Sequence, residues 1–448
     1  MSAVPTLLWA PQAWVAGQWL PDVLLEVSAQ GQWLRVAPYT SAPPQAQVLV
    51  LAGPVLPGLV NAHSHAFQRG FAGLAERRSG AQDNFWSWRD QMYRTALAAT
   101  PESLYATAHQ LYTELLHGGY TQVCEFHYLH HQPSGQPYED PLAMSLALMQ
   151  AAHDSGIGLT LLPVLYERAG FTEASLRTDQ SRFGTTVDQV IWLRDGIRRH
   201  AQQQGLRGIT AGVAVHSLRA ASAPSIAALA RRVQDDPGPV HIHIAEQLGE
   251  VNDCLATTGQ RPVAWLCQGL DQGMRIDARW HLVHATHVTP EEIDAVALTG
   301  ATLVLCPSTE ANLGDGLTDL PHWLRAGVPL AIGSDSHVTR DWREELRLAE
   351  YGQRLLHQQR NVLADPGRFG GSTAARLFEQ ALHAGGRAAG FAWCGIQVGA
   401  RADLLVLGGA GVLDAVVDQR LDTLVFSSPA SRFRQVMVGG EWVLAEEN

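Results

Sequence analysis

Between residues 53 and 397 the sequence alternates short apolar runs with longer segments of helical periodicity. After a first strand ending within 56–68, the expected strands lie at 119–128, 158–166, 208–216, 238–245, 279–287, 301–306 and 329–337. Segments such as 101–119 and 225–236 have helical spacing. Strands that alternate with helices pair in parallel through βαβ crossovers. So long a series favours an α/β fold closed into a (β/α)8 TIM-like barrel.

The two ends of the chain differ from this middle, because they contain short strand-like runs separated by glycine, proline and polar turns. These runs lie at 23–27, 33–37, 48–52, 402–407, 423–427 and 436–444. Either end alone is too small to bury a core. We therefore expect residues 1–52 and 398–448 to form one small β-sandwich domain beside a barrel domain of residues 53–397. Two independent appendages are the alternative.

Composition excludes several kinds of chemistry. The net charge of −11 argues against a nucleic-acid groove, which needs clustered basic residues. All 32 basic residues are arginine, and the sequence contains no lysine. A Schiff-base lysine, a P-loop lysine and a carbamylated lysine bridging two metals are therefore impossible. No GxGxxG motif follows the first strand, which counts against a dinucleotide-binding fold.

The cysteines bear on the compartment. They are scattered, odd in number and without a CxxC pair, at Cys124, Cys254, Cys267, Cys306 and Cys394. Neither a disulfide framework nor a thiolate zinc site is indicated, and a reducing, cytoplasmic compartment fits best. The N-terminus lacks a basic region typical of signal peptides. No apolar stretch approaches the roughly 20 residues needed to cross a bilayer, so we expect no membrane partner.

Histidines and carboxylates cluster at the predicted strand ends, where (β/α)8 barrels carry their chemistry. His63 and His65 end the first strand, and alternate strand residues face the same side. Later strand ends carry His241, His243, Glu246, His284, His287 and Asp335. An apolar strand that ends in such a group wastes burial energy unless the group is coordinated or hydrogen-bonded. One such histidine is often a satisfied core residue, but the series predicts a metal site.

Longer motifs extend this pattern. The HxH pair, the later strand-end histidines, an SD motif at 334–335 and RADLLVL at 401–407 resemble the amidohydrolase superfamily. Within it, the chain resembles the formimidoylglutamate deiminases over nearly its whole length. HxH and SD are generic to the superfamily. HSHAFQR at 63–69, EFHYLHH at 125–131 and STEANLGDG at 308–316 are far more specific.

The resemblance implies a set of site residues. The metal ligands would be His63, His65, His243 and Asp335, holding one Zn²⁺ or another divalent metal. The catalytic residues would be Glu246, His284 and Asp335. The residues contacting substrate would be Gln68, Arg89, Tyr128, His216 and Arg219. Because barrels of this superfamily are often dimers, a homodimer is also expected. His241 has no implied ligand role, and its default role is packing or support of a ligand.

The implied reaction is hydrolysis of N-formimino-L-glutamate to N-formyl-L-glutamate and ammonia, a step in histidine degradation. A metal lowers the pKa of its water towards ~7. Asp335 can then accept the water's proton, His284 can orient the nucleophile or stabilise the tetrahedral charge, and Glu246 can protonate the leaving nitrogen. The substrate carries two carboxylates, which arginine matches with its fork of donors. Arg219 is the leading clamp, and Arg89 is a weaker candidate that could be a surface ion pair.

Two other functions remain open on the residues alone. A deaminase of a purine-type base could use the same metal, Glu246 and His284, and its pocket would be lined by stacking aromatics. A metal-free scaffold of the same fold is a second alternative, although such proteins typically lose the HxH pair or the aspartate. Ser308, Thr309, Glu310 and Asn312 are expected to line the pocket or to form a structured turn, and His287 and His337 to orient ligands.

Overall fold

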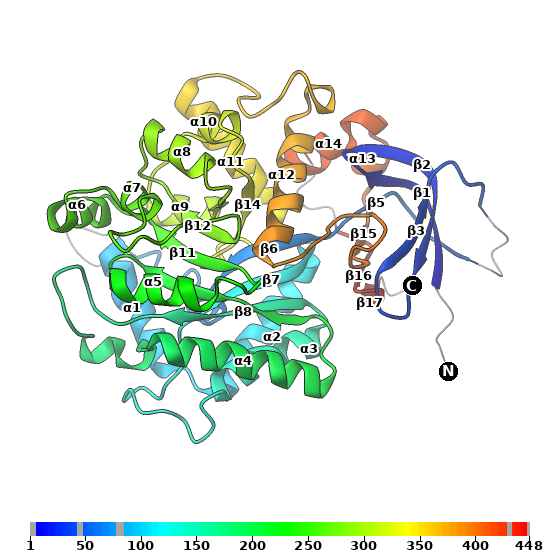
Figure 1. Ribbon diagram of the computed structural model, residues 1–448. Helices are drawn as coiled ribbons and strands as arrows, with labels where there is room; N and C mark the ends of the chain where they lie inside the picture. Colours follow the sequence, from blue (N-terminus) through cyan, green and yellow to red (C-terminus); the bar gives the residue numbers. More distant parts are fainter. Residues whose placement is uncertain (1–5, 43–47, 78–84, 428–431, 446–448) are drawn as a thin grey trace.

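The computed structural model describes residues 6–42, 48–77, 85–427 and 432–445, which contain two sheets (Figure 1). The larger sheet is parallel throughout, in the order β14-β13-β12-β11-β10-β8-β7-β6, with the short β9 beside β8. Its strands are β6 (Leu59–Ser64), β7 (Tyr120–His127), β8 (Gly158–Leu165), β9 (Ile209–Ala211), β10 (Val213–Ser217), β11 (Val240–Ile244), β12 (Trp280–His284), β13 (Thr302–Leu305) and β14 (Leu330–Ile332). The expected barrel is confirmed.

The first and last strands of this sheet meet just beyond β14. Ser64 and Asp335 form an isolated parallel bridge. The Asp335 N–H donates to the His63 carbonyl at 3.0 Å, and the His65 N–H donates to the Asp335 carbonyl at 3.2 Å. These bonds connect the two edges at the carboxyl ends of the strands. The ring is therefore closed where the candidate site lies.

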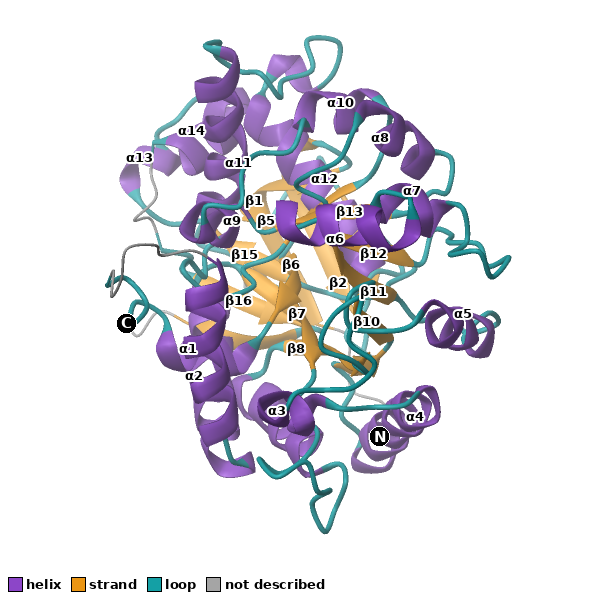
Figure 2. Ribbon diagram, turned by 90° about the vertical axis from the view of Figure 1, so that its left-hand side faces the viewer, coloured by secondary structure: helices purple, strands orange, loops and turns teal. Residues whose placement is uncertain are grey.

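Helices surround the strands on the outside (Figure 2). They are α1 (Phe85–Ala98), α2 (Pro101–His117), α3 (Ala143–Ser155), α4 (Val187–Gln204), α5 (Ala223–Arg232), α6 (Leu248–Thr258), α7 (Pro262–Cys267), α8 (Pro290–Ala297), α9 (Pro307–Leu313), α10 (Leu320–Arg325), α11 (Trp342–His357) and α12 (Thr373–Ala388), with 3-10 turns η1 (Ala66–Phe71), η2 (Thr178–Phe183) and η3 (Phe369–Gly371). Strands β7 and β8 are buried at every position. That two-sided burial explains the nearly continuous apolar sequence of β8.

The second sheet joins both ends of the chain in the order β17-β16-β15-β5-β1-β2-β3, with β4 beside β1. Its strands are β1 (Thr6–Val15), β2 (Gln18–Val27), β3 (Trp33–Ala37), β4 (Leu49–Val50), β5 (Val55–Leu56), β15 (Leu404–Val406), β16 (Gln435–Val438) and β17 (Glu441–Ala445). Leu25 and Trp33 from the first segment pack with Leu404 and Met437 from the last in a core of their own. The expected combination of the two ends is therefore confirmed, as one continuous mixed sheet.

One expected strand is wrong. Residues 423–426 belong to helix α14 (Arg420–Phe426), and Ser427 is its C-cap. This helix follows α13 (Ala410–Leu413) and η4 (Val417–Gln419). Leu421, Leu424 and Val425 are buried, and this spacing of three and four residues is that of a helical face. The five residues TLVFS look strand-like only when Leu421 is left out of the pattern. The helix packs against α11 and α12.

Element ends also differ in detail from the sequence pattern. The expected strand 48–52 is only Leu49–Val50, and β5 adds two residues to the terminal sheet beyond position 52. The run 208–216 divides into β9 and β10 at Gly212, where an added Cβ would lie 2.4 Å from the Pro239 carbonyl oxygen. Within the part of the chain that the structure describes, no helix is both long and apolar enough to cross a bilayer.

Candidate active site

Three imidazoles converge at the carboxyl ends of β6 and β11. The Nε2 atom of His63 lies 3.1 Å from that of His65 and 3.0 Å from that of His243, and the latter two are 3.3 Å apart. Tetrahedral coordination with zinc–nitrogen bonds of 2.0–2.1 Å separates neighbouring ligand atoms by about 3.3 Å. The observed spacing fits three ligands of one cation.

The opposite nitrogens fix the tautomer of two of these rings. His65 Nδ1 donates to the Phe126 carbonyl at 3.0 Å, and His243 Nδ1 donates to the His216 carbonyl at 2.9 Å. Because a carbonyl can only accept, each Nδ1 carries the proton and each Nε2 presents a lone pair to the cluster. Burial lowers the pKa of His65 to about 3 and that of His243 well below its usual value. Neutral imidazoles held in this way are suited to bind a metal.

Asp335 completes the group from the loop after β14. Its Oδ1 lies 3.4 Å from His65 Nε2 and 3.6 Å from His63 Nε2, while its Oδ2 lies 3.8 Å from His284 Nε2. The residue adopts a positive φ of 47°, a region that non-glycine residues rarely occupy. The backbone bonds to both neighbouring histidine residues hold it there. Burial raises the pKa of Asp335 to about 7.

His284 lies between three carboxylates. Its Nε2 is 3.8 Å from Glu246 Oε1, and its Nδ1 donates to Glu310 Oε1 at 3.2 Å. Glu310 is fixed in turn by the backbone N–H of Cys306 at 2.9 Å. Burial alone lowers the pKa of His284, but Glu246, Glu310 and Asp335 outweigh it and raise that pKa to about 10. The ring is therefore a positively charged donor that faces the metal cluster.

A buried polar brace holds the ends of β6 and β14 together. Asn61 Nδ2 donates to Ser334 Oγ at 2.7 Å, and the Ser334 N–H donates to Asn61 Oδ1 at 2.9 Å. Ser334 Oγ also lies 3.0 Å from His337 Nδ1. Gly333 allows this close approach, since an added Cβ would lie 2.7 Å from the Cβ of His63. The role expected of His337, to orient a metal ligand, stays a prediction. Its contact with Ser334, next to Asp335, is compatible with that role.

Glu125 provides a second support that the sequence analysis missed. Its carboxylate accepts from Ser64 Oγ and from the Ala66 N–H, each at 2.6 Å, and from the Tyr112 hydroxyl at 3.4 Å. Burial raises the pKa of Glu125 to about 7. These bonds fix the backbone on both sides of His65. A charged residue within a predicted buried strand, 119–128, was the available signal.

Three of the residues expected to contact substrate line the same side of the cluster. Gln68 Nε2 donates to the Tyr128 hydroxyl at 3.4 Å, and Gln68 Oε1 is buried without a hydrogen-bond partner among the described residues. The ring centre of Tyr128 lies 5.2 Å from that of His65 and 5.6 Å from that of His216. His216 is itself 5.2 Å from His243. The free oxygen of Gln68 and the rings of Tyr128 and His216 therefore lie near the metal ligands His65 and His243.

The two expected arginines lie on α1 and just after β10, and the charge of each acts on His216. Burial lowers the pKa of His216, and the charges of Arg219 and Arg89 lower it further, so both guanidinium groups act on one ring. The Nε atoms of both are buried and have no hydrogen-bond partner within the described ranges. Arg89 lies 4.6 Å over the Trp86 ring and 3.9 Å from Asp90. Both arginines thus present unused donors.

Several other sequence candidates lie outside this cluster. His241 Nε2 donates to the Ala388 carbonyl at 2.9 Å, and its ring lies 4.6 Å from that of His281. Helix α9 contains the four residues expected to line the pocket or to form a structured turn, Ser308, Thr309, Glu310 and Asn312. In that helix Ser308 binds Glu345, and Asn312 donates to Glu76 at 2.7 Å. Only Glu310 of these four contacts a residue of the candidate site directly.

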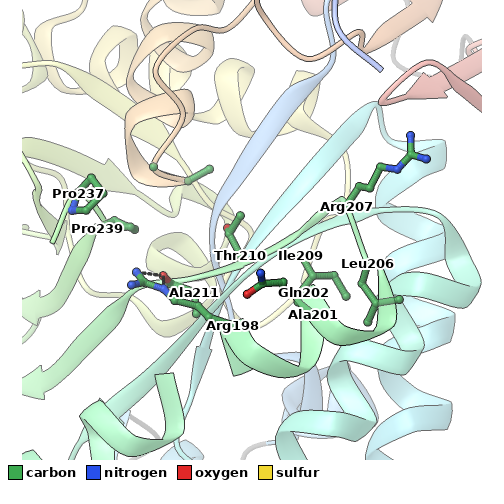
Figure 3. A pocket seen from close by; sticks show the side chains of 14 residues that line it. Arg198, Ala201, Gln202, Leu206, Arg207, Ile209, Thr210, Ala211, Pro237 and Pro239 are labelled. Carbon is green, nitrogen blue, oxygen red and sulfur yellow. Dashed lines mark hydrogen bonds between the residues drawn. The ribbon is translucent and has the colours of Figure 1, made fainter. Parts of the chain in front are cut away.

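A groove at the other end of the barrel carries none of these residues (Figure 3). It lies at the amino-terminal ends of the strands and is lined by residues of α4, β9 and the turn 237–239. Arg198, one of its walls, donates to the Ala211 carbonyl and pairs with Asp236. The main cation of the groove, Arg198, is therefore already paired.

The family is shown by comparison with known proteins. A family model described as the amidohydrolase family matches residues 55–443. The chain belongs to the amidohydrolase family. This amidohydrolase is 43% identical over 442 residues to the formimidoylglutamate deiminase of Pseudomonas aeruginosa, an alignment that covers 98% of this chain and 94% of that protein. The resemblance inferred from the motifs is confirmed.

Solved structures agree with this assignment. The crystal structure of an amidohydrolase from Brucella melitensis has a TM-score of 0.91 at 40% identity, covering 98% of this amidohydrolase and 95% of that chain. An adenosine deaminase from Xanthomonas campestris with bound zinc shares the fold, with a TM-score of 0.76 at 23% identity over 98% and 93% of the two chains. The fold class is therefore confirmed.

Proposed function

We propose that this amidohydrolase hydrolyses N-formimino-L-glutamate to N-formyl-L-glutamate and ammonia in histidine degradation, with one Zn²⁺ per subunit. The convergence of His63, His65 and His243 with Asp335, near two arginines whose Nε atoms have no hydrogen-bond partner among the described residues, is the observation that carries the proposal. Nitrogen and carboxylate donors at this spacing suit zinc. The relative of 43% identity, a formimidoylglutamate deiminase, supports the choice of substrate.

The residues of the site have distinct proposed roles. A bound Zn²⁺ lowers the pKa of water towards about 7 and so makes hydroxide available near neutral pH. Asp335 Oδ2 accepts the proton of the attacking water. His284, anchored on Glu310, orients the nucleophile and stabilises the charge that develops on the tetrahedral adduct. Glu246 delivers a proton to the substrate's imino nitrogen as the adduct forms. The proton held by Asp335 then passes to the same nitrogen and ammonia leaves, while the adduct's hydroxyl returns a proton to Glu246, so that a formyl amide remains.

The two carboxylates of the substrate need compensating charge. Arg219 and Arg89 each offer a fork of donors that matches a carboxylate. Gln68 and Tyr128 supply further polar contacts beside the metal ligands. A purine-type base carries no such pair of negative groups. A site with two arginines therefore favours a dicarboxylate substrate over a purine-type base.

The direct test is release of ammonia from N-formimino-L-glutamate, with guanine, adenosine and N-formimino-L-aspartate in parallel. We expect turnover of the glutamate derivative and none of the two bases. Turnover of guanine or adenosine alone would identify a base deaminase. A well-folded preparation that binds no zinc and gains no activity on its addition would instead identify a scaffold.

Changing Arg219→Met tests the carboxylate clamp. We expect kcat/KM for N-formimino-L-glutamate to fall by at least about 100-fold, because a charge-assisted bidentate contact is worth several kcal/mol when it is desolvated. Zinc content should stay at the parent level. Arg232→Met is the matched control, since Arg232 lies at the exposed end of α5 and pairs with Asp188. Full activity in the Arg219 variant would show that the clamp is wrongly assigned.

We further propose a cytoplasmic homodimer. All five cysteines are free thiols, which suits a reducing compartment. Sedimentation equilibrium would test the assembly, and a monomer at all concentrations would refute it.

A further inference from the structure

A histidine and a glutamate of α12 form a hydrogen-bonded row with a cysteine of the loop that follows this helix, away from the active site. Cys394 Sγ lies 3.4 Å from His383 Nδ1. The other ring nitrogen of His383 lies 3.2 Å from Glu379 Oε2. The second oxygen of Glu379 accepts from the indole N–H of Trp14 in β1 at 2.6 Å. The order of groups is nucleophile, base and orienting carboxylate.

The helix is built to receive the thiol. Glu379 and His383 lie four residues apart on α12 and therefore share one face. Gly386 lies within the same helix, where glycine is less stable than alanine by roughly 0.5–1 kcal/mol. A Cβ added at Gly386 would lie 2.9 Å from Cys394 Cβ and 3.1 Å from its Sγ. The glycine is thus what lets Cys394 pack against the helix beside His383.

The row is accessible to small molecules. Cys394 is half-buried, and the His383 side chain is 58% exposed. Cys394 also borders a cleft with Leu382, Phe391 and Trp393, but its volume of about 20 Å³ is too small to admit a reagent, so the thiol is approached from the exposed side of His383. The other charged groups of that cleft, Arg401 and Asp403, are paired with each other at 2.5 Å. No described charged group other than Glu379 therefore competes for His383.

The remaining thiols differ in their surroundings. Burial raises the pKa of Cys124, Cys254, Cys267 and Cys306, in Cys267 to about 12. Cys267 is half-buried like Cys394, but the next influence on its pKa is the negative charge of Glu292. By contrast, Cys394 Sγ lies 3.4 Å from the imidazole of His383, whose other nitrogen is held by Glu379.

We propose that Cys394 is a modification site for disulfides of low-molecular-weight thiols, with His383 as its base and Glu379 as the residue that positions His383. His383 Nδ1 takes the thiol proton, and the thiolate of Cys394 attacks one sulfur of the disulfide. A new S–S bond forms to Cys394 as the old one breaks, and the leaving thiolate takes up a proton. The reaction needs no other oxidant, because the disulfide itself is reduced.

The test is the reaction of the full-length protein with 4,4′-dithiodipyridine at pH 7, followed by the absorbance of the released thiopyridone. Peptide mass spectrometry assigns each modified residue. We expect one fast equivalent at Cys394, at least about tenfold faster than at Cys267, since the thiolate is the attacking form. Equal rates at the two cysteines would overturn the proposal.

Two variants separate the base from the residue that positions it. His383→Asn should slow the reaction of Cys394 at least about tenfold and leave Cys267 unchanged. Glu379→Gln keeps an acceptor for Trp14 but removes the charge, so the rate–pH profile of Cys394 should move to higher pH. Melting temperature and ammonia release report on folding in both. An unchanged Cys394 rate in His383→Asn, with the fold intact, would refute the role of the base.

Discussion

Gly333 connects β14 to the loop that carries Asp335, and its missing side chain makes room for the first metal ligand. A Cβ at this position would lie 2.7 Å from the Cβ of His63 and 2.8 Å from its backbone nitrogen. These atoms are the backbone and the Cβ of His63, so they cannot rotate away as the end of a flexible side chain could. The proposed metal geometry therefore depends on a residue that has no side chain to offer the metal.

We expect Gly333→Ala to reduce bound zinc and to lower kcat/KM at least about tenfold, because a misplacement near 1 Å can cost about 100-fold in rate. Metal analysis of the purified protein measures the first effect and ammonia release the second. Gly170→Ala is the control, since the nearest atom to its added Cβ is 3.6 Å away. Parent-level zinc and activity in Gly333→Ala would show that the His63 strand can shift at little cost.

Residues at strand ends could be predicted as a group because an imidazole or carboxylate there interrupts an apolar run. The residues that hold these strand ends in place could not be predicted. Asn61 binds Ser334, a residue 273 positions away. Glu125 of β7 accepts a hydrogen bond from the backbone of Ala66, just after β6. Such pairs are created by closure of the barrel, which no local pattern records. The assignment of catalytic and substrate contacts stays a prediction.

At the scale of elements, α4 is tied to the turn before β11 by an ion pair at the amino end of the barrel. Asp236 lies 2.5 Å from Arg198 Nη1 and 3.3 Å from Arg194 Nη1, and the Gly238 N–H donates to it at 2.7 Å. The hydrogen bond from Arg198, with the further bond and charges, lowers the pKa of Asp236 from 3.8 to about 2. The pair thus stabilises the fold only while Asp236 is ionised.

We expect Asp236→Asn to lower the melting temperature at pH 7. Because the folded pKa lies below the unfolded one, this stabilisation is present above pH 3.8 and disappears as the pH falls through about 2. The difference in melting temperature from the parent should therefore be constant from pH 7 to 5 and shrink towards pH 3. Asp188→Asn is the control, because its pair with Arg232 is exposed and contributes little. A difference that grows in acid would contradict the assignment.

Elements with clear periodicity were predictable, and those with mixed signals were not. The helix expected at 101–119 is α2, capped by Thr100. Strand β1 was missed, since Pro11 interrupts its apolar pattern and proline is usually excluded from strands. The long antiparallel pairing of β1 with β2 accommodates the proline. Helix α14 was mistaken for a strand because Leu421, which completes its apolar face, lies outside the run 423–427.

At the scale of the whole molecule, the proposed cation joins strands that are distant in sequence. Its ligands come from β6, β11 and the loop after β14. A ligand that binds only the folded state stabilises it by about 2.7 kcal/mol at 100 times its Kd. We expect removal of metal with a chelator to abolish ammonia release and to lower the melting temperature by several degrees, both restored by zinc. Differential scanning fluorimetry measures the shift.

His243→Asn provides the control for that measurement. With one ligand removed, the chelator should change the melting temperature little, because little metal is bound to begin with. A parent protein whose melting temperature ignores both chelator and zinc would rule out a cation that links the strands.

The terminal sheet has a consequence for synthesis of the chain on the ribosome. Strand β5 near the start pairs with β15 near the end. At about 5–20 residues per second, the ~350 residues between them take on the order of half a minute to emerge. Until then the apolar faces of β1 and β2 have no lasting cover, so the newborn protein passes through a period in which its first fifty residues are open to chaperones and to aggregation.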